Sequence, residues 1–234
     1  MKIKLAELII ELGTPDEYTI SMCRDYIYDG EKDADITAIC TKEDIEKEKK
    51  VSPGFLEKHL ENTCIYRNIC KGMIDFDAML IHSAAVAVDG TGYLFTALSG
   101  TGKTTHVNLW LKKFGEKAVI INGDKPIIRA GKDGFRVYGT PWCGKEGVNT
   151  NIDVPIAGIC ILKRGTENTI RRVTKTEALV QIMNQTVRPK EMGKMNRLLD
   201  LLEKLLEEVA VYELFCNMDI SAADVSYNGM SKKY

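Results

Sequence analysis

The sequence predicts an α/β fold in which a mixed sheet is flanked by helices. Short apolar runs with the length of strands alternate with longer segments of helical periodicity along much of the 234 residues. A glycine-rich segment, 97–104, stands between one such run and one such helix. Apolar residues make up 44% of the chain and charged residues 28%, which is the balance of a globular protein with a sizeable core.

Composition excludes several classes of function. The net charge is −1 and no basic stripe occurs, so the sequence favours neither a nucleic-acid nor a membrane partner. No apolar run approaches the roughly 18–20 residues of a membrane-spanning helix, and the first residues lack a secretory signal. The seven cysteines form no CxxC pair and lie mostly among aliphatic residues, which favours reduced, buried thiols in a cytoplasmic protein.

The first elements are short. Residues 2–12 and 36–40 alternate apolar and polar side chains, which is typical of short strands. The charged run 43–50 is expected to be a solvated stretch. Ser52 and Pro53 have the residue types of a helix N-cap and of the first helical position, so they predict a helix that starts there.

From residue 79 the pattern becomes that of a sheet. A strand over 79–88 and a strand over 93–98 flank Asp-Gly-Thr-Gly, which predicts a hairpin from its turn chemistry. A helix over 103–114 follows the glycine-rich segment. The same criteria predict, in order, a strand at 118–124, a hairpin over 126–139, a strand at 154–162, helices at 174–187 and 191–208, and a strand at 209–215.

The sequence pattern changes near residue 75, and this change indicates how the chain is divided into domains. We expect residues 1–75 to form a small N-terminal portion of strands plus a helix. Residues 76–234 are then expected to form a second, larger domain, because the motifs with recognisable chemistry, described next, all lie there.

The glycine-rich segment predicts a phosphate-binding loop. Residues 97–104 read Ala-Leu-Ser-Gly-Thr-Gly-Lys-Thr, which fits GxxxxGK[ST] with alanine in the first place. Gly100 and Gly102 let the backbone turn its N–H groups toward an anion at the start of a helix. Lys103 would contact the outer phosphates, and Thr104 would offer a hydroxyl to Mg²⁺. The other residues predicted to contact the nucleotide are Ser99, Thr101 and Thr105.

A phosphate loop also needs an acid. The next apolar run that ends in one is Ile-Ile-Asn-Gly-Asp, residues 120–124. An aspartate at the end of a buried strand beside the loop is where a metal-binding carboxylate belongs. Asp124 is therefore predicted to serve the metal and the catalysis.

These stretches resemble a known family. LIHSAAVAVDGTGYLFTALSGTGKTTH followed by AVIINGDKP is similar to the nucleotide-binding core of HPr kinase/phosphorylase and its kinase-like relatives, which share their fold with phosphoenolpyruvate carboxykinases. The resemblance is clear over about 79–130, weaker to about 220, and absent from the first 70 residues. It implies a P-loop fold of the carboxykinase type and the use of ATP or GTP with Mg²⁺.

The match also implies roles for individual residues. Gly100, Gly102, Lys103 and Thr104 match the positions that hold phosphate and metal, and Asp124 matches the acid of metal and base chemistry. A histidine on the strand before the loop, close to the phosphates, corresponds to His82. The resemblance thus assigns catalysis to His82, Lys103 and Asp124.

Two departures from the family bear on that assignment. Relatives usually carry adjacent acids at the strand end, whereas here Lys125 follows Asp124. Glu146 is a candidate for the second acid. The further metal ligands and substrate arginines of the carboxykinases have no counterpart, which argues against a true carboxykinase.

The stretch YGTPWCGKEG, 138–147, has two interpretations. Lys145 could meet a phosphate or substrate and Glu146 a metal or an acceptor hydroxyl. Alternatively, the stretch is a structural loop packed by Trp142. His106, one turn into the loop helix, is expected to be structural.

The sequence therefore predicts a cytoplasmic, Mg²⁺-dependent kinase. It would transfer a phosphoryl group from ATP or another nucleoside triphosphate to a hydroxyl of a protein, a peptide or a small metabolite. The alternative is a nucleotide-binding accessory or switch protein, or an NTPase without kinase activity. Pyrophosphate as donor, the identity of the acceptor and assembly into a homo-oligomer stay open.

Overall fold

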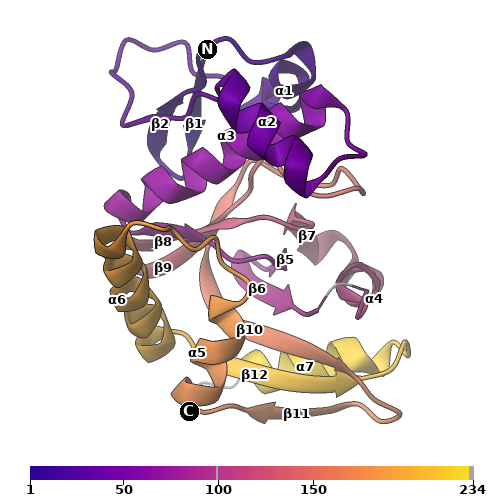
Figure 1. Ribbon diagram of the computed structural model, residues 1–234. Helices are drawn as coiled ribbons and strands as arrows, with labels where there is room; N and C mark the ends of the chain where they lie inside the picture. Colours follow the sequence, from indigo (N-terminus) through magenta and orange to yellow (C-terminus); the bar gives the residue numbers. More distant parts are fainter. Residues whose placement is uncertain (99, 232–234) are drawn as a thin grey trace.

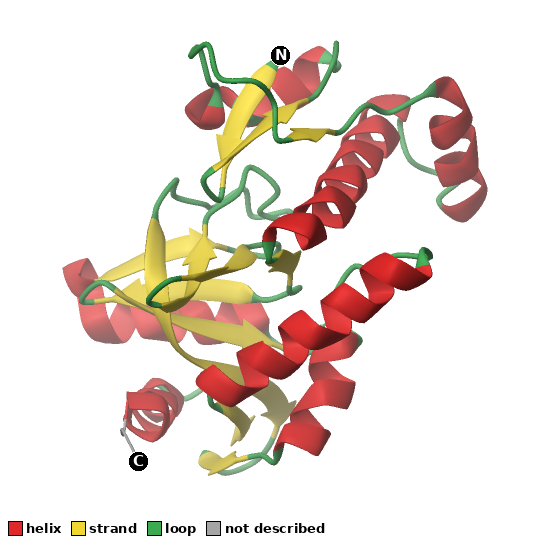
Figure 2. Cartoon of the chain, turned by 90° about the vertical axis from the view of Figure 1, so that its left-hand side faces the viewer, coloured by secondary structure: helices red, strands yellow, loops and turns green. Residues whose placement is uncertain are grey.

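The computed structural model describes residues 1–98 and 100–231, and it confirms the α/β class. Within these residues a three-stranded sheet and a nine-stranded mixed sheet are flanked by helices (Figures 1 and 2). The N-terminal elements, indigo and violet in Figure 1, lie at one end of the molecule. The larger sheet extends from the middle of the molecule to the other end, where its strands β11 and β12 and the last helix lie (Figure 1).

The small sheet starts with a hairpin. Ala6 and Glu7 both adopt left-handed backbone angles, with φ of 50° and 62°, so the stretch predicted as strand folds back on itself. The elements of this region are β1 (Lys2–Leu5), β2 (Leu8–Glu11), β3 (Ile36–Thr37), α1 (Glu17–Met22), α2 (Lys42–Val51) and α3 (Glu57–Met73).

The predicted start of the long helix is wrong. Ser52 is the C-cap of α2, and α3 begins only at Glu57. The charged run is itself helical because Thr41 and Asp44 form a capping box, in which each side chain accepts a hydrogen bond from the other residue's backbone N–H. This reciprocal cap starts α2, and the Ser-Pro pair lies between α2 and α3.

The large sheet has the order β4-β8-β9-β10-β6-β5-β7, and β12 pairs with β10 and β11. Strand β10 pairs in parallel with both β6 and β12, and the other pairings in this sheet are antiparallel. Its strands are β4 (Ala78–Leu80), β5 (Ala84–Val88), β6 (Thr91–Thr96), β7 (Ala118–Asn122), β8 (Ile127–Gly131), β9 (Gly134–Tyr138), β10 (Asp153–Arg164), β11 (Thr169–Arg172) and β12 (Val211–Cys216).

The strand predicted over 79–88 is interrupted at residues 81–83. Strand β4 pairs with β8, whereas β5 pairs with β6 and β7 near the opposite end of the sheet order. The three connecting residues, 81–83, can separate the end of β4 from the start of β5 by at most about 14 Å. The sheet must therefore curl to bring these strands together, and His82 lies in the connection rather than on a strand.

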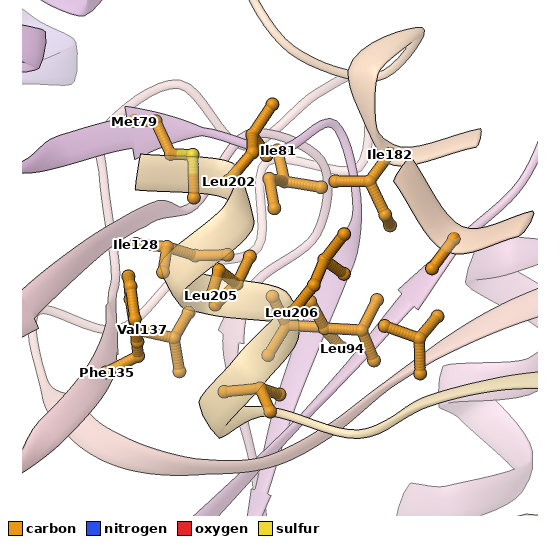
Figure 3. Close-up of a cluster of buried hydrophobic side chains, with 14 of the residues drawn as sticks. Met79, Ile81, Leu94, Ile128, Phe135, Val137, Ile182, Leu202, Leu205 and Leu206 are labelled. Atoms are coloured by element: carbon orange, nitrogen blue, oxygen red, sulfur yellow. The ribbon is translucent and has the colours of Figure 1, made fainter. Parts of the chain in front are cut away.

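Helices cover both faces of the large sheet. Leu94 faces the core under α5 and α6, while its neighbour Phe95 faces the core under α4 and α7. Figure 3 shows the first of these cores, with Leu202, Leu205 and Leu206 packed on the strands. The helices are α4 (Lys103–Phe114), α5 (Lys175–Met183), α6 (Met192–Glu208) and α7 (Ser221–Ser231), and short 3₁₀ turns occupy Arg24–Tyr26, Ile74–Phe76 and Gly115–Lys117.

Helix α3 joins the two sheets. Ile65, Ile69 and Met73 on this helix share one buried cluster with the small sheet and with Leu80 and Ile127 of the large one. The division near residue 75 stays a prediction, since this core is continuous across it. In the described part of the chain, no helix has the length and apolarity to cross a membrane.

Candidate functional site

The glycine-rich segment connects β6 to α4, as the sequence predicts. Gly100 and Gly102 have φ of +76° and +119°, in the region that side chains other than glycine rarely adopt. Gly102 is the N-cap of α4, and in the described residues no side chain caps this helix start. The first backbone N–H groups of α4 are thus available to an anion. Ser99, also predicted to contact the nucleotide, lies outside the described residues.

Three side chains from separate segments meet beside this helix start. Lys103 Nζ, in the first turn of α4, lies 3.3 Å from His82 Nε2. The same nitrogen of His82 lies 2.8 Å from Oδ1 of Asp124, which follows β7. Lys125 Nζ lies 3.3 Å from the other carboxylate oxygen, Oδ2. The structure therefore brings together the three residues predicted to be catalytic, with Lys125 added.

The charges of this cluster depend on one another. Burial raises the pKa of Asp124, but the hydrogen bond with His82 and the charge of Lys125 outweigh it, so the net pKa is lowered. Burial lowers the pKa of Lys103, and the nearby Asp124 carboxylate offsets part of that effect. Asp124 is thus held as a carboxylate, and the partly buried ammonium of Lys103 would gain from an anionic ligand.

Asn122 fixes the backbone of the acidic segment. This last residue of β7 is fully buried, and its Oδ1 accepts hydrogen bonds from the N–H groups of Asp124 at 2.8 Å and Lys125 at 2.6 Å. Its Nδ2 donates to the carbonyl oxygen of Thr140 at 2.9 Å. This role was not predicted from the sequence, although an Asn two residues before the acid is a known turn-forming pattern.

Two backbone contacts hold His82 in place. Its N–H donates to the carbonyl oxygen of Gln185 at 2.7 Å, and its carbonyl oxygen accepts from Thr96 Oγ1 at 2.9 Å. Thr96 is the last residue of β6, directly before the glycine-rich segment. The connection that carries His82 is thereby tied to the strand that leads into that segment.

Within the described residues, the remaining predicted residues form no hydrogen bond or ion pair with the side chains of the cluster. Thr104 and Thr105 are exposed in the first turn of α4, and the Thr101 N–H donates to the Leu98 carbonyl oxygen at 3.1 Å. Lys145 and Glu146 are exposed, and within the described chain neither forms an ion pair with the cluster.

The 138–147 stretch reaches the cluster through a glycine instead. A Cβ atom placed on Gly144, which has φ of +80°, would lie 2.9 Å from the Cβ of Asp124. Trp142 is buried, as the structural interpretation of this stretch predicts. The carboxylate thus has a wall of backbone on this side, with Lys145 and Glu146 in the exposed turn that follows.

His106 is a structural residue of the loop helix. It is buried, its Nε2 lies 3.1 Å from Ser226 Oγ, and burial lowers its pKa to about 4. Trp110 Nε1 donates to the same Ser226 oxygen at 2.9 Å. Neutral His106 therefore links α4 to α7, as expected from the sequence.

Two hollows open beside the glycine-rich segment at the ends of the parallel strands, where ligands of α/β proteins commonly bind. One, of about 490 Å³, lies between α4 and the ends of β10 and β12. The other, of about 250 Å³, lies between the ends of β6 and β10 and the end of α5. Arg164 lines both, and its Nη2 donates to the Gly100 carbonyl oxygen at 2.7 Å.

The side chains of the site suit a metal ion that is bound partly by the protein and partly by the phosphates of a ligand. Residues 1–98 and 100–231 contain no group of three or more His, Cys, Asp or Glu side chains that could bind a metal. Mg²⁺ commonly uses one or two protein carboxylates and completes its shell with water and substrate phosphates. Asp124 supplies one such carboxylate beside the start of α4, and the predicted second ligand, Thr104, is exposed in the first turn of that helix.

Comparison with known proteins finds similarity among solved structures alone. No family model matches the chain, and no curated protein matches it. Among solved structures, the chain is similar to the HPr(Ser) kinase/phosphatase from Coxiella burnetii, with 12% identity and a TM-score of 0.31. This similarity covers 55% of the present chain and 88% of the other.

Proposed function

We propose that the chain is an HPr kinase-like phosphotransferase with a P-loop fold of the carboxykinase type, acting on a nucleoside triphosphate and a hydroxyl-bearing acceptor. The observation that carries the proposal is the meeting of Lys103, His82 and Asp124 at the uncapped start of α4. A cation and free N–H groups suit the phosphates of the donor. A carboxylate kept ionised within reach of them suits an acceptor.

Each residue then has a defined task. The backbone at Gly100 and Gly102 and the ammonium of Lys103 bind the donor phosphates. Asp124 orients the acceptor hydroxyl and takes its proton as the oxygen bonds to the transferred phosphorus and the bond to the nucleoside diphosphate breaks. His82 holds Asp124 in position through their 2.8 Å contact. Mg²⁺, bound by Asp124 and Thr104, would neutralise charge on the phosphates.

One observation favours a second candidate, a nucleotide-binding switch that does not turn over. Lys125 Nζ contacts Asp124 Oδ2, on the carboxylate that catalysis requires. If this ion pair persisted with nucleotide bound, one carboxylate oxygen would be withheld from the metal and the acceptor. The two candidates differ in turnover and agree in nucleotide binding.

The test is transfer of label from γ-phosphate-labelled ATP, with Mg²⁺, to a mixed pool of peptides and small hydroxyl compounds. The kinase proposal predicts labelled product that requires the protein. Release of phosphate without labelled product would indicate an NTPase. Calorimetric binding of ATP with neither product nor phosphate release would favour the switch.

A further inference from the structure

The region that the sequence leaves without a role is the N-terminal portion, and its helix α3 reaches the candidate site. Figure 1 shows α3 lying between the small sheet and the strands of the large one. The described contacts place one residue of this helix, Tyr66, directly behind the acidic segment. Tyr66 is 5% exposed, and its hydroxyl donates to the carbonyl oxygen of Lys125 at 2.6 Å.

This contact acts on the residue next to the proposed base. Lys125 presents its side chain to Asp124 Oδ2, so fixing the Lys125 backbone restricts where that ammonium can lie. Thr140 Oγ1 donates to the same carbonyl oxygen at 2.9 Å. The carbonyl would thus keep a hydrogen-bond partner if the Tyr66 hydroxyl were removed, and only the restraint from α3 would be lost.

The same tyrosine also packs against the segment that leads to Gly144. Its ring stacks on Trp142, with centroids 4.4 Å apart and an interplanar angle of 18°. Trp142 Nε1 in turn donates to Asn62 Oδ1 of α3 at 2.9 Å. Two residues further along the chain, the backbone of Gly144 lies close to the side chain of Asp124. Tyr66 therefore contacts both segments that enclose the carboxylate.

We propose that Tyr66 is a positioning residue for Asp124, and that α3 thereby makes the N-terminal portion part of the transfer site. The inference rests on the proposed function, because it assigns Tyr66 to the support of that reaction. Burial raises the pKa of Tyr66 far above its ordinary value, so the hydroxyl stays protonated and donates throughout the working pH range.

The test compares Tyr66→Phe with a matched control, Tyr93→Phe. Tyr93 is also buried, and its hydroxyl contacts Ser231 Oγ at 3.1 Å, on the face of the sheet covered by α4 and α7. Both variants lose one hydroxyl from a buried ring. We would measure three quantities for the wild type and for both variants. They are the turnover of labelled ATP with Mg²⁺, the affinity for ATP, and the NMR signals of the imidazole nitrogens of the protein.

Tyr66→Phe is expected to lower turnover about tenfold while ATP affinity stays within twofold. The NMR signals of His82, which contacts Asp124, should shift in Tyr66→Phe and not in Tyr93→Phe. A Tyr66→Phe protein with wild-type turnover and wild-type His82 signals would overturn the inference.

The His82 signals separate this inference from the function on which it rests. If the wild type shows no turnover, the proposed function fails, and the NMR comparison still tests whether Tyr66 positions Asp124. If the wild type turns over and both variants slow equally, Tyr66 contributes only general stability and the inference is wrong.

Discussion

At the scale of single residues, the centre of the site is one nitrogen with two partners. His82 Nε2 lies within contact distance of both Asp124 Oδ1 and Lys103 Nζ. A ring nitrogen that donates its proton to a carboxylate has no lone pair left for an ammonium. Phosphates bound at the start of α4 would attract the Lys103 ammonium away from the imidazole, and His82 would keep its contact with Asp124. We therefore expect Lys103 to give up its contact with His82 and to contact the bound phosphates instead.

This interpretation predicts the effect of removing the cation. Lys103→Ala should weaken ATP binding about ten- to a hundredfold, because a charge-assisted contact contributes about 1.5–3 kcal/mol. Lys112→Ala, exposed at the other end of the same helix, is the control and should bind as the wild type does. Calorimetry in the presence of Mg²⁺ gives both affinities. Equal ATP affinities for Lys103→Ala and the wild type would show that the start of α4 does not bind the phosphates.

Residue identity predicted part of this cluster. Lys103 and Asp124 were predicted because a motif and a strand end fix their places along the chain. Asn122 was not, because its role depends on a side-chain amide that bonds two N–H groups and a distant carbonyl oxygen at once. Lys125 was predicted to be unusual, but only the folded chain shows its ammonium on Asp124 Oδ2.

At the scale of elements, the segment after β9 brings backbone rather than a side chain to the carboxylate. Gly144 has φ of +80°, and an added Cβ would lie 2.9 Å from the Cβ of Asp124. Gly147, three residues later, has φ of +66° and open space around its Cβ position. A substitution at either glycine would strain the backbone, but only at Gly144 would the new Cβ also contact Asp124.

Gly144→Ala and Gly147→Ala therefore form a matched pair. Each should cost about 1–2 kcal/mol of stability, because alanine is strained at positive φ. Gly144→Ala should in addition lower turnover at least tenfold by displacing Asp124, with ATP affinity little changed. Urea unfolding and steady-state turnover provide the two measurements. Similar turnover in the two variants would show that this wall does not position the acid.

The contact between α4 and α7 predicts a dependence of stability on pH. Burial lowers the pKa of His106 to about 4, so the unfolded chain, with a histidine pKa near 6.5, binds more protons between these values. The stabilisation from neutral His106 is therefore complete above about pH 6.5 and is lost as the pH falls toward 4. Between pH 7 and pH 5 the loss should be about 2 kcal/mol.

The measurement is the free energy of unfolding in urea at both pH values, for the wild type and for His106→Gln. The variant lacks the titrating group, so its stability should fall less by about that amount. Identical losses in the two proteins would mean that His106 is not held neutral by the fold.

At the scale of the whole molecule, the site forms where distant parts of the chain meet. The described contributors come from the connection after β4, the start of α4, the end of β7 and the segment after β9. The sheet curls because β4 and β5, separated by three residues, pair at opposite ends of the strand order. That curl brings His82 to the loop that follows β6.

Local patterns predicted the order of the central elements and failed where tertiary contacts decide. Turn chemistry and periodicity predicted hairpins over 79–98 and 126–139 and a helix over 103–114. The structure has hairpins at 84–96 and 127–138, within the predicted ranges, and confirms the helix. The break at 81–83 could not be predicted, because the apolar run is continuous and only its pairing partners change. Helices α1 and α7 were missed, since each depends on packing rather than on a strong periodic pattern.

The central claim is that Asp124 acts as a carboxylate in metal-dependent phosphoryl transfer. The most direct measurement is the loss of γ-phosphate from labelled ATP, followed against Mg²⁺ concentration for the wild type, Asp124→Asn and Asp89→Asn. Asp89 lies in the exposed turn between β5 and β6, where asparagine tolerates the φ of 48°, so this control should behave as the wild type does.

Asparagine keeps the shape of the side chain but carries no charge and is not a useful base at neutral pH. We therefore expect that Asp124→Asn folds, binds ATP and turns over at least about a hundredfold more slowly at every Mg²⁺ concentration. Wild-type turnover in Asp124→Asn would rule out this role of Asp124 and place the acid of this site elsewhere.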